Sequence, residues 1–286
     1  MDLRRRKRLI TELIPSVRRA GDAAHALQRR GIGARIKADK SPVTSADLAS
    51  HEILLEGCHS QVPDIPVLSE EDTMLAFGPL AGEIALLLDP LDGTKEFICG
   101  RDDFTVNIAL VEAGFPTAGV VYAPAVRRLF FSYGRHRAFS QSSAAAPCPI
   151  LPQADPRSAP IVLVSRSHCD ERTEQLLQAL RPCEVRQLGS SLKFAFVAAG
   201  EADVYLRLGP MMVWDCAAGQ AIVEAAGGVV LGLDGNRLRY DRSEAGRVEG
   251  LVAARSGEVA ARVLAASRSL EPRPSAIDAP CLLHPR

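Results

Sequence analysis

The sequence predicts an α/β protein of two closely packed lobes, built as layers of helices and sheets. Three patterns indicate this fold class. Apolar residues recur at helical spacing near the N-terminus, strand-like runs separated by glycine and proline fill residues 105–131, and strands alternate with helices after residue 161. With 286 residues and 47% hydrophobic content, the chain can bury a sizeable core, as one large domain or as two packed ones.

The first half is expected to contain helices packed on a sheet. An amphipathic helix is predicted from the N-terminus to about Gln28, and a second from Ser45, whose hydroxyl is expected to cap it. Short buried strands follow at 67–68 and 84–88. Three longer strands between 105 and 131 are expected to form an antiparallel meander.

The second half is predicted to alternate strands and helices. Residues 141–160, rich in Ser, Ala and Pro, mark the boundary between the halves. We therefore expect an N-terminal α+β lobe at 1–155, a C-terminal α/β lobe at 156–266 and a disordered tail at 267–286. The expected strands of the second half are 161–164, 202–206 and 228–231, and the expected helices are 171–180, 190–199 and 215–226.

Charge and cysteine content argue against several classes of protein. Lys+Arg and Asp+Glu both number 34, so the net charge is zero, whereas proteins that bind nucleic acid through its phosphates normally show a basic excess. We therefore expect a small anionic ligand and no nucleic-acid partner. The seven cysteines follow no C-x-x-C spacing, which argues against a zinc site or disulfide framework and favours the reducing cytoplasm.

No integral membrane segment is expected, because no apolar run approaches the roughly 20 residues that a membrane helix needs. The basic run Arg4–Arg8 is similar to the start of a signal peptide, but Glu12 and Pro15 follow it and no small-residue cleavage site is present. We interpret the run as the solvated start of a helix. Peripheral association with the inner membrane is left open, as is the choice between a monomer and a homodimer.

Acidic residues follow predicted strands or begin a helix at three places. Glu70 follows one short strand. Asp89 and Asp92 follow the next strand, and Asp215 lies near the start of a later helix. Clustered carboxylates repel one another unless cations neutralise them, and oxygen-only ligands favour Mg²⁺ or Mn²⁺ over zinc. Such a centre activates water and stabilises the leaving oxygen in phosphoryl transfer.

The segment Asp89–Thr94 combines metal ligands with a phosphate site. Pro90 is expected to stiffen a turn that puts both aspartates on one side, and the Leu91 carbonyl is expected to point inward as a neutral ligand. Gly93 permits close approach of a phosphate, and Thr94 is expected to cap the next helix, whose N–H groups attract anions. The alternative is an ordinary Asx turn with solvated acids. An EF-hand is excluded because its twelve-residue ligand spacing is absent.

Four segments resemble the signatures of the inositol monophosphatase superfamily, in that family's order and at its distances. They are Pro42–Asp47, Ser69–Glu71, Asp89–Thr94 and Trp214–Gly219. The resemblance covers roughly residues 10 to 255 and implies a layered αβαβα sandwich of the inositol monophosphatase and fructose-1,6-bisphosphatase type. Five longer runs are similar to one branch, the CysQ-type 3'(2'),5'-bisphosphate nucleotidases: Leu91–Phe97, Phe104–Leu110, Gly119–Pro124, Ser165–His168 and Gly189–Phe194.

The resemblance implies a role for each matched residue near the acids. Glu70, Asp89 and the Leu91 carbonyl would bind a first Mg²⁺. Asp89, Asp92 and Asp215 would bind a second, with two or three ions in all. Asp47 and Thr94 would orient and deprotonate the attacking water, with Glu70 as a third catalytic group. A threonine hydroxyl is too weak a base alone, so a carboxylate must accept its proton. The residues expected to contact the reacting phosphate are Glu70, Leu91, Asp92, Gly93, Thr94 and Asp215.

The resemblance also implies that the second half recognises the rest of the substrate. His168, Ser190, Lys193 and Arg207 would line a nucleotide pocket. A bisphosphate carries about four negative charges, so a lysine and an arginine far from the metals would bind its second phosphate. The alternatives are a capping role for His168, a surface ion pair for Arg207 and a plain N-cap for Asp215. Lys193 lies in an otherwise apolar helix, where an unpaired lysine is disfavoured.

The sequence therefore predicts a Mg²⁺-dependent nucleotidase that hydrolyses adenosine 3',5'-bisphosphate to AMP and phosphate. The alternative is an inositol monophosphatase or a broader sugar-phosphate phosphatase on the same scaffold. A non-catalytic nucleotide-binding regulator is disfavoured, because every expected catalytic group is present. The resemblance further implies inhibition by Li⁺. Cys216, next to Asp215, is expected to be an inert core residue rather than a site of oxidation.

Overall fold

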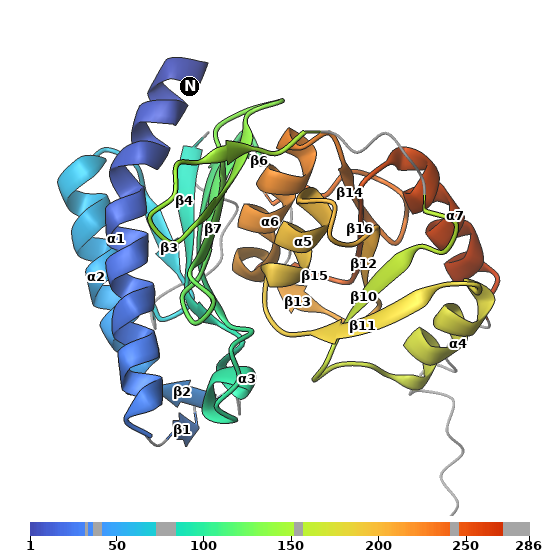
Figure 1. Ribbon diagram of the computed structural model, residues 1–286. Coiled ribbons are helices and arrows are strands. Elements are labelled where there is room, and N and C mark those ends of the chain that lie inside the picture. Colours follow the sequence, from blue (N-terminus) through green and yellow to red (C-terminus); the bar gives the residue numbers. More distant parts are fainter. Residues whose placement is uncertain (32–33, 37–41, 73–83, 152–156, 241–245, 271–286) are drawn as a thin grey trace, which may run out of the picture.

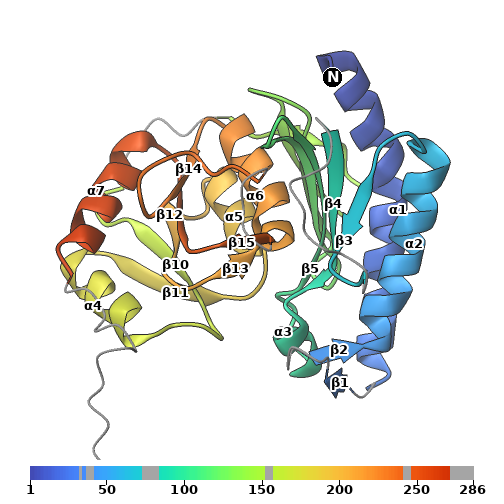
Figure 2. The same cartoon turned by 180° about the vertical axis from the view of Figure 1, so that it is seen from behind.

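The protein stacks its secondary structure in five layers, helix–sheet–helix–sheet–helix, as Figures 1 and 2 show. The structure, a computed structural model, describes residues 1–31, 34–36, 42–72, 84–151, 157–240 and 246–270. One helix pair covers the outer face of each sheet, and a third pair lies between the sheets. The predicted α/β class and its layered αβαβα arrangement are confirmed.

The first sheet belongs to the N-terminal half, and its strands follow one another in chain order. β3 and β4 are parallel, and every later neighbour is antiparallel. The predicted meander is therefore confirmed, and it continues through two further strands that the sequence did not indicate. The strands are β3 (Val67–Ser69), β4 (Ile84–Asp92), β5 (Thr105–Glu112), β6 (Phe115–Ala123), β7 (Arg128–Ser132), β8 (Ala138–Ser142) and β9 (Cys148–Pro149).

Helices α1 (Leu3–Arg29) and α2 (Ser45–Gln61) cover the outer face of this sheet. The apolar stripe of α1 is buried, since Leu13 and Val17 have no exposed surface. The two helices approach closely at Gly57, where a Cβ atom would lie 2.3 Å from Oγ of Ser16. This contact fixes α2, which carries part of the site described below, against the longer α1.

The N-terminus of α2 differs from the prediction. Its N-cap is Thr44, not Ser45, because the Thr44 side chain accepts a hydrogen bond from the Ala46 N–H at 3.1 Å. The Asp47 carboxylate reaches back to the Thr44 N–H at 2.7 Å and completes a capping box. Two short antiparallel strands, β1 (Ala34–Ile36) and β2 (Pro42–Thr44), lead into this helix.

The second sheet belongs to the C-terminal half and has the order β11-β10-β12-β16-β14. Helices α4 (Glu171–Ala179) and α7 (Gly257–Arg268) cover its outer face, and α5 (Leu192–Ala198) and α6 (Val213–Ala225) lie between the two sheets. The strands are β10 (Ile161–Ser165), β11 (Glu184–Leu188), β12 (Val204–Arg207), β14 (Val229–Gly232) and β16 (Leu251–Ala254), and β13 (Met211–Met212) pairs separately with β15 (Arg247–Val248).

The two lobes share a core along α6. A Cβ atom on Gly119 of β6 would lie 2.7 Å from the carbonyl oxygen of Ala218 of α6, so only glycine allows the helix to lie this close to the sheet. The buried cluster here joins Leu87 and Val121 of the first sheet to Tyr205 of the second. This packing fixes the position of α6, and hence of Asp215, relative to β4.

Several boundaries of the second half differ from the predicted ones. The helix expected at 190–199 begins at Leu192, because Ser190 has a φ of 49° and interrupts the helical backbone. The first residues of the stretch expected to be a tail, 267 and 268, belong to α7, which continues to Arg268 and buries Ser267 to 6% exposure. Residues 271–286 lie outside the described residues, as do 152–156 at the expected boundary between lobes.

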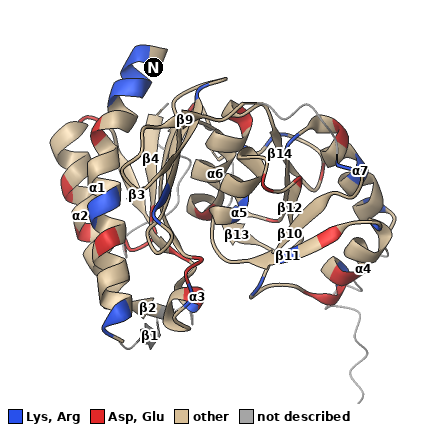
Figure 3. Ribbon diagram, viewed as in Figure 1, with Lys and Arg blue, Asp and Glu red and all other residues tan. Residues whose placement is uncertain are grey.

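The basic run at the start of the chain lies on the first turns of α1, where Figure 3 shows Lys and Arg gathered. Arg6 pairs with Glu112 at 2.7 Å, and Arg8 pairs with Glu12 at 2.8 Å. The run therefore belongs to a folded helix, as interpreted from the sequence. Across the described part of the chain, no helix combines the length and the apolar character required to cross a membrane.

Candidate active site

Four acidic side chains meet where β3 and β4 end beside the N-terminus of α6. Glu70 follows β3, and Asp89 and Asp92 lie in the last part of β4. One carboxylate oxygen from each of Glu70, Asp89 and Asp215 lies within 4.8 Å of the others. The Asn107 amide donates at 3.4 Å to Oδ2 of both Asp89 and Asp92, so these two carboxylates face the same space. The structure therefore brings the predicted acidic segments together.

Burial makes the negative charge of this cluster costly unless a cation is bound. Asp89 has no exposed surface, and burial, followed by the carboxylates of Asp92, Glu70 and Asp215, raises its pKa well above the usual value. Burial likewise raises the pKa of Asp215, and Asp92 and Glu70 add to the effect. A set of oxygen ligands with this excess of negative charge fits Mg²⁺ or Mn²⁺.

The segment that follows Asp89 is an irregular end of β4. The register with β5 shifts between Asp89 and Asp92, and the Leu91 N–H donates to Oδ1 of Asp89 at 3.2 Å. Gly93 has a φ of 91°, a left-handed conformation that favours glycine. Gly93 is the N-cap of α3 (Thr94–Ile98), so the expectation that Thr94 caps this helix is wrong. Thr94 is its first residue, and its side chain has other partners.

The Thr94 hydroxyl lies between Asp47 and the main chain of Leu91. Its Oγ1 is 3.3 Å from Oδ1 of Asp47 and 3.2 Å from the Leu91 carbonyl oxygen. Asp47 is 2% exposed, and burial raises its pKa although two hydrogen bonds from Thr44 oppose the shift. The capping box thus holds a carboxylate whose proton affinity is raised beside a threonine hydroxyl, as a proton-accepting pair requires.

Two residues that the sequence prediction did not select hold Asp92 in place. Ser191 donates to Oδ2 of Asp92 from its N–H at 2.5 Å and approaches it with its hydroxyl at 2.6 Å, and the same hydroxyl lies 2.6 Å from the Asp215 carbonyl oxygen. Asn107 bonds Ser191 Oγ at 3.1 Å. A signal for Asn107 was present in the sequence, because it is a polar residue in the middle of an apolar strand.

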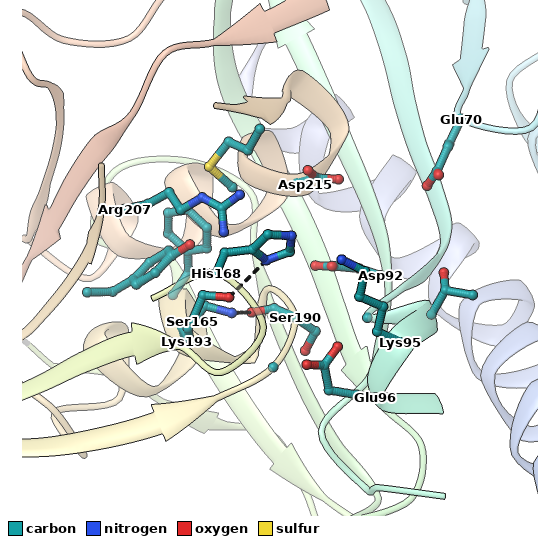
Figure 4. Close-up of a pocket in the computed structure, with 16 residues that line it drawn as sticks. Glu70, Asp92, Lys95, Glu96, Ser165, His168, Ser190, Lys193, Arg207 and Asp215 are labelled. Atoms are coloured by element: carbon teal, nitrogen blue, oxygen red, sulfur yellow. Dashed lines mark hydrogen bonds between the residues drawn. The ribbon is translucent and has the colours of Figure 1, made fainter. Parts of the chain in front are cut away.

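A cavity of about 410 Å³ lies beside the acidic cluster, between the two lobes. Figure 4 shows Asp92 and Asp215 on one side and Arg207, Lys193 and His168 on the other. Of the predicted site residues, Glu70, Asp92, Gly93, Thr94, His168, Ser190, Lys193, Arg207 and Asp215 line this cavity. Asp47, Asp89 and Leu91 do not line it but lie behind it, at 2%, 0% and 1% exposure.

Basic and apolar groups form the side of the cavity farther from the acids. Lys193 is 4% exposed, and its ammonium group donates to the Ser190 carbonyl at 2.5 Å. Arg207 donates to the carbonyls of Gly209 and Pro210 at 3.2 and 2.8 Å, which orients its guanidinium. Burial, with the positive charge of Arg207 next, lowers the pKa of His168 to about 4, so this imidazole is neutral at physiological pH. The cavity lining also includes Lys95, Glu96, Tyr205 and Met211, which were not predicted.

Contacts between the lobes hold the cavity wall that carries His168. Oδ2 of Asp103 accepts hydrogen bonds from Arg166 at 2.8 Å and from the Gly189 N–H at 2.7 Å. Ser167 donates to Glu96 at 2.6 Å. We call Asp103, Glu96 and their three partners the lobe clamp. It joins the segment before β5 and α3 to the loops after β10 and β11, and two of its members, Glu96 and Gly189, line the cavity.

Comparison with known proteins identifies the family of this chain. The sequence model of the inositol monophosphatase family matches residues 6–271. The chain belongs to this family. The match confirms the resemblance inferred from the four signature segments, and it spans both lobes and all the predicted site residues.

Several relatives within the family share a third to nearly half of their aligned residues with this chain. The 3'(2'),5'-bisphosphate nucleotidase CysQ of Salmonella typhimurium is 45% identical over 216 residues, which cover 73% of this chain and 83% of that protein. The CysQ of Escherichia coli is 44% identical over the same shares. The crystal structure of CysQ from Bacteroides thetaiotaomicron superposes with a TM-score of 0.73 at 33% identity, covering 85% of this chain and 96% of that one. The suhB protein of Bartonella henselae shares the fold, with a TM-score of 0.75 at 22% identity.

Cys216 is adjacent to Asp215 but does not line the cavity. It is fully buried, and burial raises the pKa of its thiol far above the usual value. A thiol that stays protonated is a poor target for oxidants. The structure therefore agrees with the expectation of a core residue.

Proposed function

We propose that the protein is a Mg²⁺-dependent 3'(2'),5'-bisphosphate nucleotidase that hydrolyses adenosine 3',5'-bisphosphate to AMP and phosphate. One observation carries this proposal: a single cavity joins the acidic cluster to Lys193 and Arg207, two basic groups on the opposite wall. A substrate with two separate phosphates places one phosphate at each end, whereas a monophosphate bound at the acidic cluster places no phosphate at the basic end. The names of the relatives that are 44% and 45% identical support the same substrate class.

In this proposal Glu70, Asp89, Asp92, Asp215 and the Leu91 carbonyl hold two or three Mg²⁺ ions. When bound, the ions neutralise the carboxylates and the phosphate and lower the pKa of water. Asp47 accepts a proton from the Thr94 hydroxyl, and that hydroxyl in turn orients the attacking water and takes its proton. The distance of 3.3 Å between Thr94 Oγ1 and Asp47 Oδ1 supports this pairing. Phosphoryl transfer then depends mainly on positioning and charge neutralisation.

Recognition of the nucleotide falls to the wall formed by the C-terminal lobe. Lys193 and Arg207 bind the phosphate that is not cleaved, and the neutral His168 is suited to hydrogen bonds with the sugar or base. Ser190, whose φ of 49° turns the chain toward the cavity, contributes to the same wall. The six described cysteines form no disulfide, which supports the proposal that the protein works in the reducing cytoplasm.

The test is a comparison of kcat/KM for adenosine 3',5'-bisphosphate, AMP and inositol 1-phosphate with saturating Mg²⁺. We expect the bisphosphate to be preferred by at least about tenfold, since one charge-assisted contact contributes about 1.5–3 kcal/mol. Equal or better hydrolysis of inositol 1-phosphate would show instead that this is an inositol or broader sugar-phosphate phosphatase. Phosphate release from none of the substrates, with nucleotide binding retained, would favour a non-catalytic regulator.

A further inference from the structure

One face of α2 contacts the chain segments on which the acidic cluster is built. Asp47 lies at the first turn of this face and contacts the segment after β4, as described above. Ser50 donates to the carbonyl oxygen of Pro90 at 2.5 Å. His51 lies one turn after Asp47, and its Nδ1 is 2.8 Å from Oγ of Ser69 at the end of β3. Because residues three and four positions apart share a helix face, α2 contacts both segments from one side.

His51 lies between two residues of the turn that contains Glu70. Its Nε2 is 3.8 Å from Oδ1 of Asp72, and its side chain is 13% exposed. A carboxylate beside Nε2 favours the tautomer with the proton on that nitrogen, which leaves Nδ1 to accept a hydrogen bond from the Ser69 hydroxyl. Asp72 also accepts a hydrogen bond from the Ser69 N–H at 3.3 Å and donates its own N–H to the Ser69 carbonyl at 3.1 Å. The three side chains thus close the turn around Glu70.

The sequence of contacts Asp72–His51–Ser69 has the residue types of a hydrolytic triad, but burial rules out that role. Ser69 has no exposed surface, so no substrate reaches its hydroxyl. Ser69 matters instead because it directly precedes Glu70 in the chain. The Glu70 N–H donates to the Leu88 carbonyl at 3.1 Å, which fixes the main chain on the side of β4. His51 fixes it on the side of α2.

We propose that His51 is a positioning residue for metal binding: through Ser69 it holds the turn that directs the Glu70 carboxylate toward Asp89 and Asp215. The inference rests on the proposed function in one respect, that these carboxylates bind Mg²⁺. Groups that orient a metal ligand commonly contribute 10- to 100-fold in metal affinity. Without the His51–Ser69 contact, the turn that contains Glu70 loses its attachment to α2. Mg²⁺ binding must then order this turn, which lowers the favourable free energy of binding.

The test is calorimetric titration of the substrate-free protein with Mg²⁺. We expect His51→Ala to raise the Kd for Mg²⁺ by about tenfold, and Ser69→Ala to do the same because it removes the other partner of the bond. His51→Asn places an amide oxygen near the position of Nδ1 and is expected to restore most of the affinity. The matched control is His59→Ala, which changes an exposed histidine on the same helix and should leave the Kd unchanged.

Thermal unfolding of the metal-free variants separates positioning from a general loss of structure. Positioning predicts that the Tm of metal-free His51→Asn and Ser69→Ala stays close to that of the wild type. An unchanged Kd in Ser69→Ala would overturn the proposal, as would an Asn variant that binds Mg²⁺ as weakly as the Ala variant. The titration involves no substrate, so a wild type that binds Mg²⁺ yet hydrolyses no bisphosphate would refute the nucleotidase assignment and leave the role of His51 to be decided by the Kd values.

Discussion

Oγ1 of Thr94 lies 3.3 Å from Oδ1 of Asp47, although 47 positions separate the two residues in the chain. The other carboxylate oxygen, Oδ2, binds the N–H and hydroxyl groups of Thr44 at 2.7 and 2.6 Å. The N-terminal cap of α2 therefore fixes the carboxylate with one oxygen directed at Thr94. A capping interaction that stabilises a helix thus also sets the geometry of the proposed proton-accepting pair.

Removing the Thr94 hydroxyl is expected to lower kcat by about 10²- to 10⁴-fold, the usual contribution of a positioned acid–base group. We expect Thr94→Ser to retain most activity because it keeps the hydroxyl. The measurement is the rate of phosphate release at saturating Mg²⁺, with circular dichroism to verify folding. Near-normal turnover by Thr94→Ala would refute the role of the pair.

The affinity for the bisphosphate is expected to fall above pH about 8. Burial lowers the pKa of Lys193 to about 8, although the carboxylates of Asp92 and Glu96 oppose the shift. The ammonium form exists below this pKa, so its charge is lost as the pH rises through it, and KM should then increase. Lys193→Arg retains its charge at every working pH and should keep KM flat up to pH about 9. The same rise in KM with the arginine variant would assign the titration to another group.

The lobe clamp is expected to control substrate affinity without affecting metal binding. Asp103→Asn weakens the hydrogen bonds to Arg166 and Gly189, and should raise KM by about tenfold, the effect expected when a charge-assisted hydrogen bond is lost. The Kd for Mg²⁺, measured by calorimetry, should not change. The matched control is Asp102→Asn at the exposed neighbouring residue, which should leave both KM and the Kd for Mg²⁺ unchanged. A parallel increase in both constants for Asp103→Asn would show that the clamp supports the metal ligands as well.

Removing one buried charge from the acidic cluster is expected to stabilise the metal-free protein. Asp89→Asn relieves the repulsion among the carboxylates and lowers the desolvation cost, so its Tm without metal should exceed that of the wild type. Mg²⁺ should raise the Tm of the wild type but not that of the variant, because a central ligand is lost. Thermal unfolding with and without Mg²⁺ checks both statements. An equal Mg²⁺-dependent increase in the two proteins would exclude Asp89 from metal binding.

The close approach of α6 to the first sheet depends on Gly119. Gly119→Ala places a methyl group 2.7 Å from the Ala218 carbonyl oxygen and is expected to reduce the free energy of unfolding by about 1–3 kcal/mol. In Gly257→Ala the new Cβ atom meets no described atom within 4 Å, so this control should be neutral or slightly stabilising. Urea denaturation measures both. Equal stability of Gly119→Ala and the wild type would mean that the sheet and helix can separate at little cost.

Patterns confined to a few neighbouring residues were predictable. The helical stripe of α1, the meander β5–β7 and the acidic residues after β3 and within β4 all follow from local spacing, and the structure contains each of them. Local reasoning failed where a competing contact came from elsewhere. The Thr94 hydroxyl, expected to cap α3, contacts Asp47 instead. The late start of α5 has a local cause, because Ser190 adopts a left-handed conformation that its side chain does not reveal.

The sequence by itself indicated the type of reaction. The tertiary structure decided which contacts position the site residues and which residues line the cavity for the substrate. Asp89–Thr94 carries three of the proposed metal ligands and the proposed catalytic hydroxyl within six residues, so their types and spacing indicate the reaction without knowledge of the fold. The hydrogen bonds between Ser191 and Asp92, between His51 and Ser69 and between Gly189 and Asp103 span 99, 18 and 86 positions. They exist only after α2 packs on the first sheet and α6 brings the two lobes together, because hydrogen bonds act over about 3 Å and sequence spacing does not fix such distances.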